Sequence, residues 1–287
     1  MKNIGVIGIG AIGSLITKYL IQNQAHNYFF FNRSPKEIIK IEFQGKEDVI
    51  HISNSYPKQQ KLDWLIVCLK EYHFKNAIPI LSELIESDTK VAIFQNGINI
   101  ADRYKQFSDS NNLLETIIDC PVERIGPDAY RQIRNPKIVL PESEIANQFM
   151  TLFTDPSIEF LVSNNFKALQ WIKLIESSSV GSIQAINKLP CSVFQDPEKL
   201  REFIELVDEG ILVARSEGII LDKDLDQQLL CKLKAYPETK SSSMLSDKLS
   251  GNELELDAKI GVIVKIAMRN GVNVPTSSRV YNTQIRN

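Results

Sequence analysis

The first half of the chain alternates short apolar runs with segments of helical periodicity. The apolar runs predict strands at 4–9, 28–31, 62–70, 90–97, 137–141 and 158–162. The run at 62–70 is continuous, which is typical of strands buried on both faces of a sheet. Helical spacing follows the first run and returns through 145–153. This alternation predicts an α/β domain with a mostly parallel sheet.

After residue 165 the pattern becomes helical throughout. Helices are predicted at 166–188, 198–217, 225–235, 257–270 and 277–285. Prolines separate these segments, and Gly218 and Gly271 stand where helices are expected to end. The chain is therefore expected to contain an α/β domain over residues 1–165 and an all-α domain over residues 166–287.

A glycine motif follows the first predicted strand. The stretch "GIGAIG" places Gly8, Gly10 and Gly13 between that strand and an amphipathic helix. In a Rossmann-type dinucleotide-binding domain the first glycine makes the turn, the second admits the pyrophosphate, and the third lets the helix pack closely. We expect the whole loop, including Ile9, Ala11 and Ile12, to bind the cofactor. The alternative is a glycine-rich turn selected for packing alone.

The end of the second strand indicates which dinucleotide binds. An NAD site usually has a carboxylate there for the ribose 2′-hydroxyl, whereas an arginine suits a 2′-phosphate. This strand ends in Asn32 and Arg33, with no carboxylate before Glu37. The sequence therefore favours NADP(H), the alternative being an ordinary exposed loop arginine.

Two further strand ends belong to the same edge of the predicted sheet. Lys70 follows the third strand, and Asn96 with Gly97 follows the fourth. Ligands of open α/β sheets bind beyond the carboxyl ends of the strands, so both are candidate site residues. Each also has a simple interpretation as a turn residue.

Lys173 lies on an apolar stripe of the first predicted helix of the second half. Phe166, Leu169 and Val180 share its face at helical spacing. A lysine in such surroundings is either an acid in a functional site or a surface lysine whose stem covers apolar neighbours, paired with Glu176.

Composition narrows the functional classes. With 287 residues, a net charge of −2 and no long basic run, the chain does not suggest nucleic-acid binding. Four scattered cysteines and three distant histidines suggest a reduced cytosol and neither a disulfide framework nor a metal site. No apolar run reaches the roughly 18 residues of a membrane span, and glycines interrupt the apolar N-terminus. We therefore expect a cytoplasmic protein that binds neither membranes nor metals.

The order of these motifs resembles 2-dehydropantoate 2-reductase (ketopantoate reductase) over the whole chain. The resemblance rests on the glycine motif, Lys70, "QNG", Lys173-Leu174, "SSSML", a Glu-x-Asp and the closing "RNGVNVPTSSRVY". It implies NADPH-dependent reduction of a 2-oxo acid on the route to pantothenate and coenzyme A. It further implies that Gly8, Gly10, Gly13, Arg33 and Lys70 bind the cofactor.

The same resemblance implies roles in the helical domain. Lys173 matches the catalytic acid that protonates the alkoxide, and Glu255 matches the glutamate that binds substrate and places the lysine. Ser243 matches the serine that contacts the substrate carboxylate, and Asn96 matches the asparagine near nicotinamide and substrate. Glu255 could instead be a solvated acid, and Ser243 could instead cap a turn.

The chain departs from the family where two asparagines would follow the lysine by four and eight residues. Ser177 and Gly181 occupy these positions. Ser177 keeps one short hydrogen bond for the substrate, whereas Gly181 opens space. Three interpretations follow: a ketopantoate reductase with a rearranged pocket, a sibling NADPH reductase for another 2-oxo acid, and a non-catalytic NADP(H)-binding protein. Retention of Lys173, Glu255 and Asn96 argues against the third. A homodimer through the helical domain is compatible with the sequence.

Overall fold

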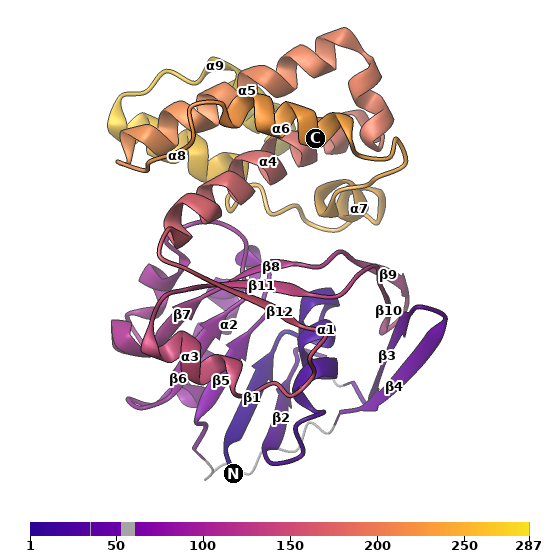
Figure 1. Cartoon of the computed structure of the whole chain (residues 1–287), viewed down its shortest axis with the longest axis vertical. Helices are drawn as coiled ribbons and strands as arrows, with labels where there is room; N and C mark the ends of the chain where they lie inside the picture. Colours follow the sequence, from indigo (N-terminus) through magenta and orange to yellow (C-terminus); the bar gives the residue numbers. More distant parts are fainter. Residues whose placement is uncertain (35, 53–60, 287) are drawn as a thin grey trace. The chain divides into compact units, whose positions relative to one another are not determined.

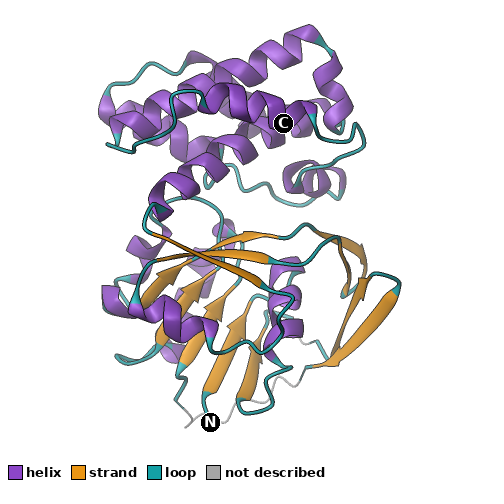
Figure 2. Cartoon of the chain, in the orientation of Figure 1, coloured by secondary structure: helices purple, strands orange, loops and turns teal. Residues whose placement is uncertain are grey.

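The computed structural model describes residues 1–34, 36–52 and 61–286, and it divides into two compact units. One comprises Met1–Gln95 and Asn99–Phe166, and we call it the sheet unit. The other comprises Asn96–Ile98 and Lys167–Asn287, and we call it the helical unit. The division thus assigns the short segment after Gln95 to the helical unit. Figures 1 and 2 show the α/β character of the first and the helical character of the second.

A five-stranded parallel sheet forms the centre of the sheet unit, as the alternating pattern predicts. Its order is β2-β1-β5-β6-β7. The strands are β1 (Asn3–Ile7), β2 (Asn27–Phe31), β5 (Trp64–Val67), β6 (Lys90–Ile93) and β7 (Leu113–Glu115). The predicted strands at 62–70 and 90–97 are thus shorter in the structure. Lys70 and Asn96 follow them in the connecting loops.

Helices cover both faces of this sheet, which explains why its strands are continuously apolar. In β5 the side chains alternate: Trp64 and Ile66 join a core with α1 (Ala11–Leu20) and α3 (Glu144–Met150). Leu65 and Val67 join a second core with α2 (Phe74–Leu84), which is not among the predicted elements. Burial on both faces removes the alternation of polar and apolar residues that one-sided strands show.

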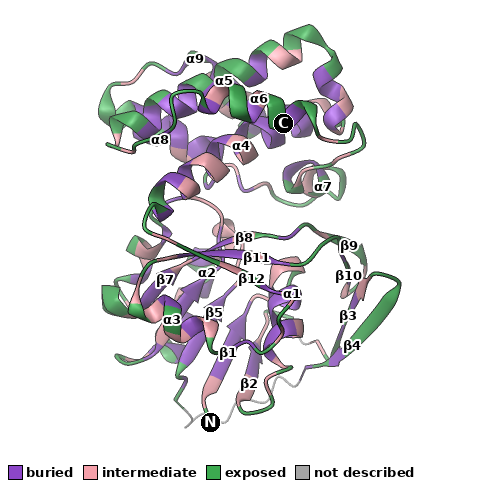
Figure 3. Cartoon of the chain, in the orientation of Figure 1, coloured by how far each residue is buried: buried purple, intermediate pink, exposed green. Residues whose placement is uncertain are grey.

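Two smaller sheets complete the sheet unit. The order β12-β11-β8 joins β8 (Ile117–Asp119), β11 (Lys137–Pro141) and β12 (Glu159–Ser163). The order β4-β3-β10-β9 joins β3 (Ile38–Phe43), β4 (Lys46–His51), β9 (Val122–Gly126) and β10 (Ala129–Gln132). The hydrophobic pattern does not predict this four-stranded sheet, because its strands carry many charged residues and β4 is mostly exposed (Figure 3).

In its described residues, the helical unit contains an α-helix at each predicted segment, one further α-helix, and a 3-10 helix at Cys191–Gln195. The α-helices are α4 (Phe166–Asn187), α5 (Pro197–Ser216), α6 (Leu225–Lys234), α7 (Ser243–Leu249), α8 (Ile260–Asn270) and α9 (Pro275–Arg286). Gly271 ends α8 in the left-handed conformation, as predicted. The predicted helix at 257–270 begins three residues late, because residues 256–259 form turns. The seven-residue α7 is not predicted.

Packing around α4 and α5 organises the helical unit. Gly210 of α5 lies against Ile175 of α4, where an added Cβ would lie 2.9 Å from Ile175 Cγ1. The buried Glu209 carboxylate accepts hydrogen bonds from the backbone N–H groups of Thr276 and Ser277 at 2.8 and 2.7 Å. It thereby satisfies donors that the first turn of α9 leaves unpaired.

Among the described residues, the helices are all too short or too polar to cross a bilayer.

Candidate functional site

The turn from β1 into α1 gives each glycine of the motif a distinct role. Gly8 has φ +88°, in the left-handed region that favours glycine. A Cβ on Gly13 would lie 2.2 Å from the Gly8 carbonyl oxygen, so only glycine allows this approach of helix to loop. A Cβ on Gly10 would meet nothing within 4 Å. The loop is therefore closely packed at its base and open at Gly10.

Asn32 connects the end of β2 to this loop. Its Oδ1 accepts a hydrogen bond from the Ile9 N–H at 2.8 Å. Its Nδ2 is buried and, within the described part of the chain, has no hydrogen-bond partner. Arg33, the next residue, is exposed. The asparagine thus holds the loop with one side of its amide and leaves a donor for another group.

Lys36 also holds the loop, and sequence reasoning did not identify it. Its Nζ donates to the Ile9 carbonyl oxygen at 2.8 Å and forms an ion pair with Asp128 at 2.5 Å. Asp128 belongs to the turn between β9 and β10. No local motif marks Lys36, because its partner comes from a sheet that the sequence pattern does not predict.

These residues fit a dinucleotide pyrophosphate. The open Gly10 lies at the N-terminus of α1, where the first-turn N–H groups have no partner within the helix and attract an anion. Gly10 contributes no capping side chain that would compete. Lys70, after β5, is half-buried, and its Nζ lies 5.9 Å from the Tyr72 ring centroid.

In the helical unit, the candidate residues of α4 lie along one face. Lys173, Ser177 and Gly181 are spaced by four residues. Lys173 and Ser177 are half-buried. Glu176, the partner expected of a surface Lys173, instead pairs with Lys232 at 2.7 Å and accepts a hydrogen bond from the Tyr236 hydroxyl. That arrangement weakens the interpretation of Lys173 as one half of a surface pair with Glu176.

The expectation that Gly181 opens space is wrong. Gly181 is buried against α7, and a Cβ there would lie 2.9 Å from Met244 Sδ and 3.3 Å from Met244 Cγ. The methionine side chain occupies the volume that an asparagine would take. Sequence reasoning missed this because α7 itself is not predicted.

The start of α7 is fixed to the same face of α4. Gln184, eleven residues after Lys173, accepts a hydrogen bond from the Ser242 N–H at 2.8 Å. Ser242 is the N-cap of α7, since its Oγ accepts from the Leu245 N–H at 3.2 Å. Ser243 therefore does not serve as the cap, and its hydroxyl has another partner. Lys259 Nζ donates to Ser243 Oγ at 3.1 Å.

Glu255 is buried rather than solvated. Only 6% of it is exposed, and its Oε2 accepts a hydrogen bond from Asn96 Nδ2 at 3.0 Å. Asn96 and Glu255 are 159 residues apart in sequence. The structure thus brings together two of the residues that the resemblance selects.

Asp257, two residues later, anchors the Glu255 segment. It pairs with Lys265 at 2.8 Å and accepts a hydrogen bond from the Tyr281 hydroxyl at 2.5 Å. This hydrogen bond, with burial and the nearby charge of Asp257, raises the pKa of Tyr281 to about 12. Asp257 therefore ties the segment to α8 and α9, and Glu255 bonds to Asn96.

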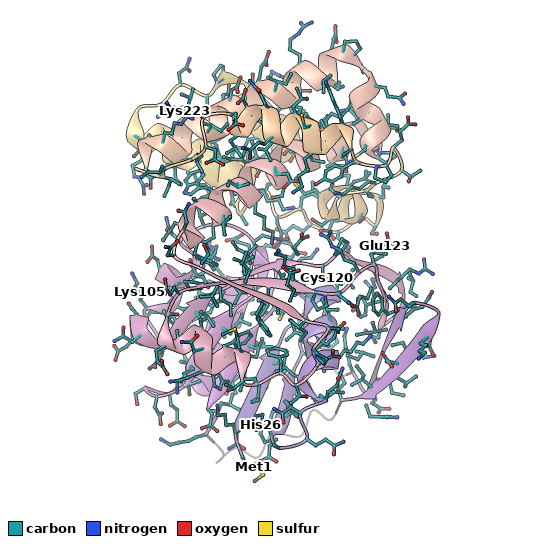
Figure 4. All side chains as sticks on the ribbon, in the orientation of Figure 1. Met1, His26, Lys105, Cys120, Glu123 and Lys223 are labelled. Carbon is teal, nitrogen blue, oxygen red and sulfur yellow. The ribbon has the colours of Figure 1, made fainter. Side chains whose placement is uncertain are left out.

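A pocket of about 320 Å³ lies one turn beyond the contact between Gly181 and Met244 along both helices. Its lining is Ala185, Ile186, Lys188, Lys248, Leu254 and Gln284, all within the helical unit. Cys120 lies buried in the sheet unit (Figure 4), and all four cysteines are free thiols. Among the described residues, no cluster of three or more His, Cys, Asp or Glu is placed to hold a metal.

The chain matches two family models that together span most of its length. Residues 4–144 match "Ketopantoate reductase PanE/ApbA" and residues 165–284 match its C-terminal model. The 2-dehydropantoate 2-reductase of Caulobacter vibrioides is 29% identical over 282 residues, covering 98% of this chain and 97% of that protein.

Solved structures share the fold. A dimeric ketopantoate reductase from Staphylococcus aureus matches with a TM-score of 0.87 and 22% identity, covering 98% of this chain and 96% of the other. D-mandelate dehydrogenase, solved with NADH and anilino(oxo)acetate, matches with a TM-score of 0.88 and 18% identity over the same shares.

Proposed function

The chain belongs to the ketopantoate reductase family, and from this membership we propose that it reduces 2-dehydropantoate to pantoate with NADPH, as a step of pantothenate and coenzyme A biosynthesis. Members of the family are NAD(P)-dependent reductases of 2-oxo acids. The hydrogen bond between the buried Glu255 and Asn96 carries the proposal, because it joins two expected active-site residues in the unit that holds Lys173.

The cofactor is proposed to be NADPH, although D-mandelate dehydrogenase was solved with NADH. The loop from Gly8 to Gly13 (with Ile9, Gly10, Ala11 and Ile12) would hold the pyrophosphate. The exposed Arg33 would pair with the 2′-phosphate beside Asn32, whose buried Nδ2 would supply one donor. Lys70 is the remaining residue proposed to bind the cofactor. When bound, NADPH supplies the hydride for the C2 carbonyl.

Lys173 serves as the acid. As the carbonyl is reduced, its ammonium donates a proton to the C2 oxygen and stabilises the negative charge that develops there. Glu255 and Asn96 bind the substrate and orient it toward this proton. Ser177 and Ser243 supply hydroxyl groups for the remaining polar groups of the substrate, and Ser243 binds its carboxylate.

A second candidate is the reduction of a different 2-oxo acid. The close contact between Gly181 and Met244 favours it, because this position offers a thioether where the family's asparagine would offer an amide. A site that hydrogen-bonds a substrate group discriminates strongly through that bond, so its loss changes which substrates are preferred.

The assay is NADPH oxidation by the purified protein with 2-dehydropantoate and a panel of 2-oxo acids. We expect Lys173→Ala to lower kcat by about 10²- to 10⁴-fold, since a positioned general acid contributes that much. Lys167→Ala, an exposed lysine of the same helix, is the control and should leave kcat unchanged.

The outcomes separate the candidates. Turnover of 2-dehydropantoate that collapses only in Lys173→Ala supports the first, and turnover of another acid supports the second. NADPH binding without turnover on any substrate would indicate a non-catalytic binding protein. Near-normal turnover in Lys173→Ala would refute the assignment of the acid.

The remaining assignments are part of the same proposal. Residues 1–165 would bind the cofactor, and residues 166–287 would supply the substrate and catalytic groups, in a cytoplasmic enzyme. A homodimer is proposed by likeness to the dimeric Staphylococcus aureus protein, and light scattering of the purified chain tests it.

A further inference from the structure

Lys259 is a buried lysine whose ammonium lies beneath an exposed serine. Only 3% of Lys259 is exposed, whereas Ser243 is an exposed residue. Their side chains meet at 3.1 Å between Nζ and Oγ. Removing an ammonium group from water is costly, and lysines are rarely buried to this extent. A lysine at this depth needs polar neighbours for its ammonium group, and Ser243 is one of them.

The contact sets the direction of the serine hydroxyl. An ammonium group has three donors and no acceptor, so Ser243 Oγ must accept from Lys259. The hydroxyl hydrogen then points away from the ammonium and is available as a donor. Ser242 already caps α7, so Ser243 is not needed to complete the helix. Lys259 thus makes Ser243 a donor toward the solvent side, backed by a positive charge.

The position of this pair connects it to the candidate site. Ser243 directly precedes Met244, which packs against Gly181 on the face of α4 that carries Lys173. Lys259 follows Glu255 by four residues in the segment that Asp257 anchors. One segment therefore supplies both the carboxylate that bonds Asn96 and the ammonium that bonds Ser243.

We propose that Lys259 is a positioning residue that makes Ser243 selective for the substrate carboxylate. This inference rests on the proposed function, in which Ser243 binds that carboxylate. A charge-backed hydroxyl donor stabilises an anionic acceptor more than a neutral one. The site then prefers a 2-oxo acid over its neutral methyl ester, and Lys259 sets that preference without contacting the substrate.

The first test is kinetic. Lys259→Met is unbranched and only one atom shorter, and it removes the charge. We expect it to raise KM for the acid by about 10- to 100-fold, as for loss of a hydrogen bond to a charged group. The KM for the methyl ester and kcat for both should change less than threefold. Lys259→Arg should recover part of the preference, and Ser243→Ala should abolish it.

Two controls separate this role from a structural one. Lys223→Met, at an exposed lysine of the same unit (Figure 4), should change neither KM. In the Ser243→Ala background, Lys259→Met should have no further effect on the ratio of acid to ester, because the lysine acts through the serine. A merely structural lysine would raise both KM values together and lower the thermal midpoint, and that result would overturn the inference.

A binding measurement separates failure of the inference from failure of the proposed function. Calorimetry with 2-dehydropantoate, and with the acids of the panel, in the presence of NADP⁺ measures carboxylate binding without turnover. Binding that weakens at least tenfold in Lys259→Met, with no turnover in the unaltered protein, keeps the inference and rejects the reductase. Turnover by the unaltered protein, with the same carboxylate affinity in Lys259→Met, supports the reductase and rejects the inference. Absence of any binding to the unaltered protein rejects both.

Discussion

Gly13 of the sheet unit and Gly181 of the helical unit are both buried glycines that permit a close approach, and they differ in what approaches them. A Cβ on Gly13 would lie 2.2 Å from a backbone oxygen, that of Gly8. A Cβ on Gly181 would lie 2.9 Å from a side-chain atom, Met244 Sδ. The first neighbour is fixed by the turn itself. The second belongs to a flexible side chain with three rotatable bonds.

This difference separates a fixed site from an adjustable one. The shape around Gly13 depends on the backbone, so any side chain there disrupts the turn that a dinucleotide requires. The shape around Gly181 depends on a pair of side chains, and two substitutions can change it while the helices stay in place. We infer that the proposed cofactor end of the protein is constrained by its backbone, whereas the proposed substrate end can be altered by paired substitutions.

The largest effects on stability and on NADPH affinity are expected from alanine substitutions in the glycine loop, at Gly13 and, separately, at Gly10. Gly13→Ala forces α1 away from the loop, and we expect it to lower the free energy of unfolding by about 3 kcal/mol or more. NADPH binding should be lost in the same variant. Gly10→Ala meets no protein atom within 4 Å, so its thermal midpoint should stay within a few degrees. Its methyl group would face the pyrophosphate, and NADPH affinity should fall at least tenfold. Thermal melts and fluorescence titration measure both quantities.

A stable Gly13→Ala variant that still binds NADPH would contradict the difference between Gly13 and Gly181, since the backbone at Gly13 would then be as adaptable as the side chain at Gly181. Equal loss of stability in both variants would show that Gly10 is required for folding and that its openness is not reserved for a ligand.

The sheet unit was predictable where burial dictates the pattern. Strand β11 has the predicted bounds, and the glycine motif has the predicted geometry at Gly8 and Gly13. The four-stranded sheet was not predicted, because β4 is a mostly exposed strand of mixed charge and shows no apolar alternation. Lys36 was not identified either, since its ion-pair partner Asp128 lies in the turn between β9 and β10 of that sheet.

The helical unit was predictable in its long helices and not in its short one. Periodicity over two turns is too little to identify α7, although its N-cap Ser242 belongs to a run of three serines. The burial of Lys259 was not predicted, because "NELELDAKI" has the composition of a solvated segment. Burial of this lysine and its contact with Ser243 of α7 depend on tertiary packing, and local sequence cannot reveal them.

A smaller effect, on the preference between the two cofactors, is expected at Arg33 in the proposed cofactor site. The unaltered protein should bind NADPH at least tenfold more tightly than NADH, a difference of about 1.4 kcal/mol, because the 2′-phosphate gains an arginine partner. Arg33→Ala should remove most of that difference and leave NADH affinity and stability unchanged, since the side chain is exposed. Titration of both cofactors measures the ratio.

Comparable affinities of the unaltered protein for the two cofactors would reject the assignment of NADPH. Loss of NADH affinity in Arg33→Ala would instead place the arginine against a part common to both cofactors. Lys36→Ala is the useful companion, because it should weaken both cofactors alike through the carbonyl oxygen of Ile9 that it holds.

The smallest effect is expected at Gly181. The nearest atoms to a Cβ on Gly181 belong to the flexible side chain of Met244, which can move by a few tenths of an ångström. Gly181→Ala should therefore lower stability by only about 1 kcal/mol. Adding Met244→Ala should recover part of this loss, because the two side chains compete for one volume, and the two effects should not add.

Gly181→Asn tests the same volume at the substrate end. Alone it should displace Met244 and lower stability by about 1 to 3 kcal/mol, and with Met244→Ala it should fit and offer an amide on the face of Lys173. The ratio of kcat/KM for 2-dehydropantoate to that for other 2-oxo acids should then rise in the double variant. If Gly181→Ala proved as damaging as Gly13→Ala, α4 and α7 would be held as rigidly as the glycine loop, and the substrate end could not be altered by paired substitutions.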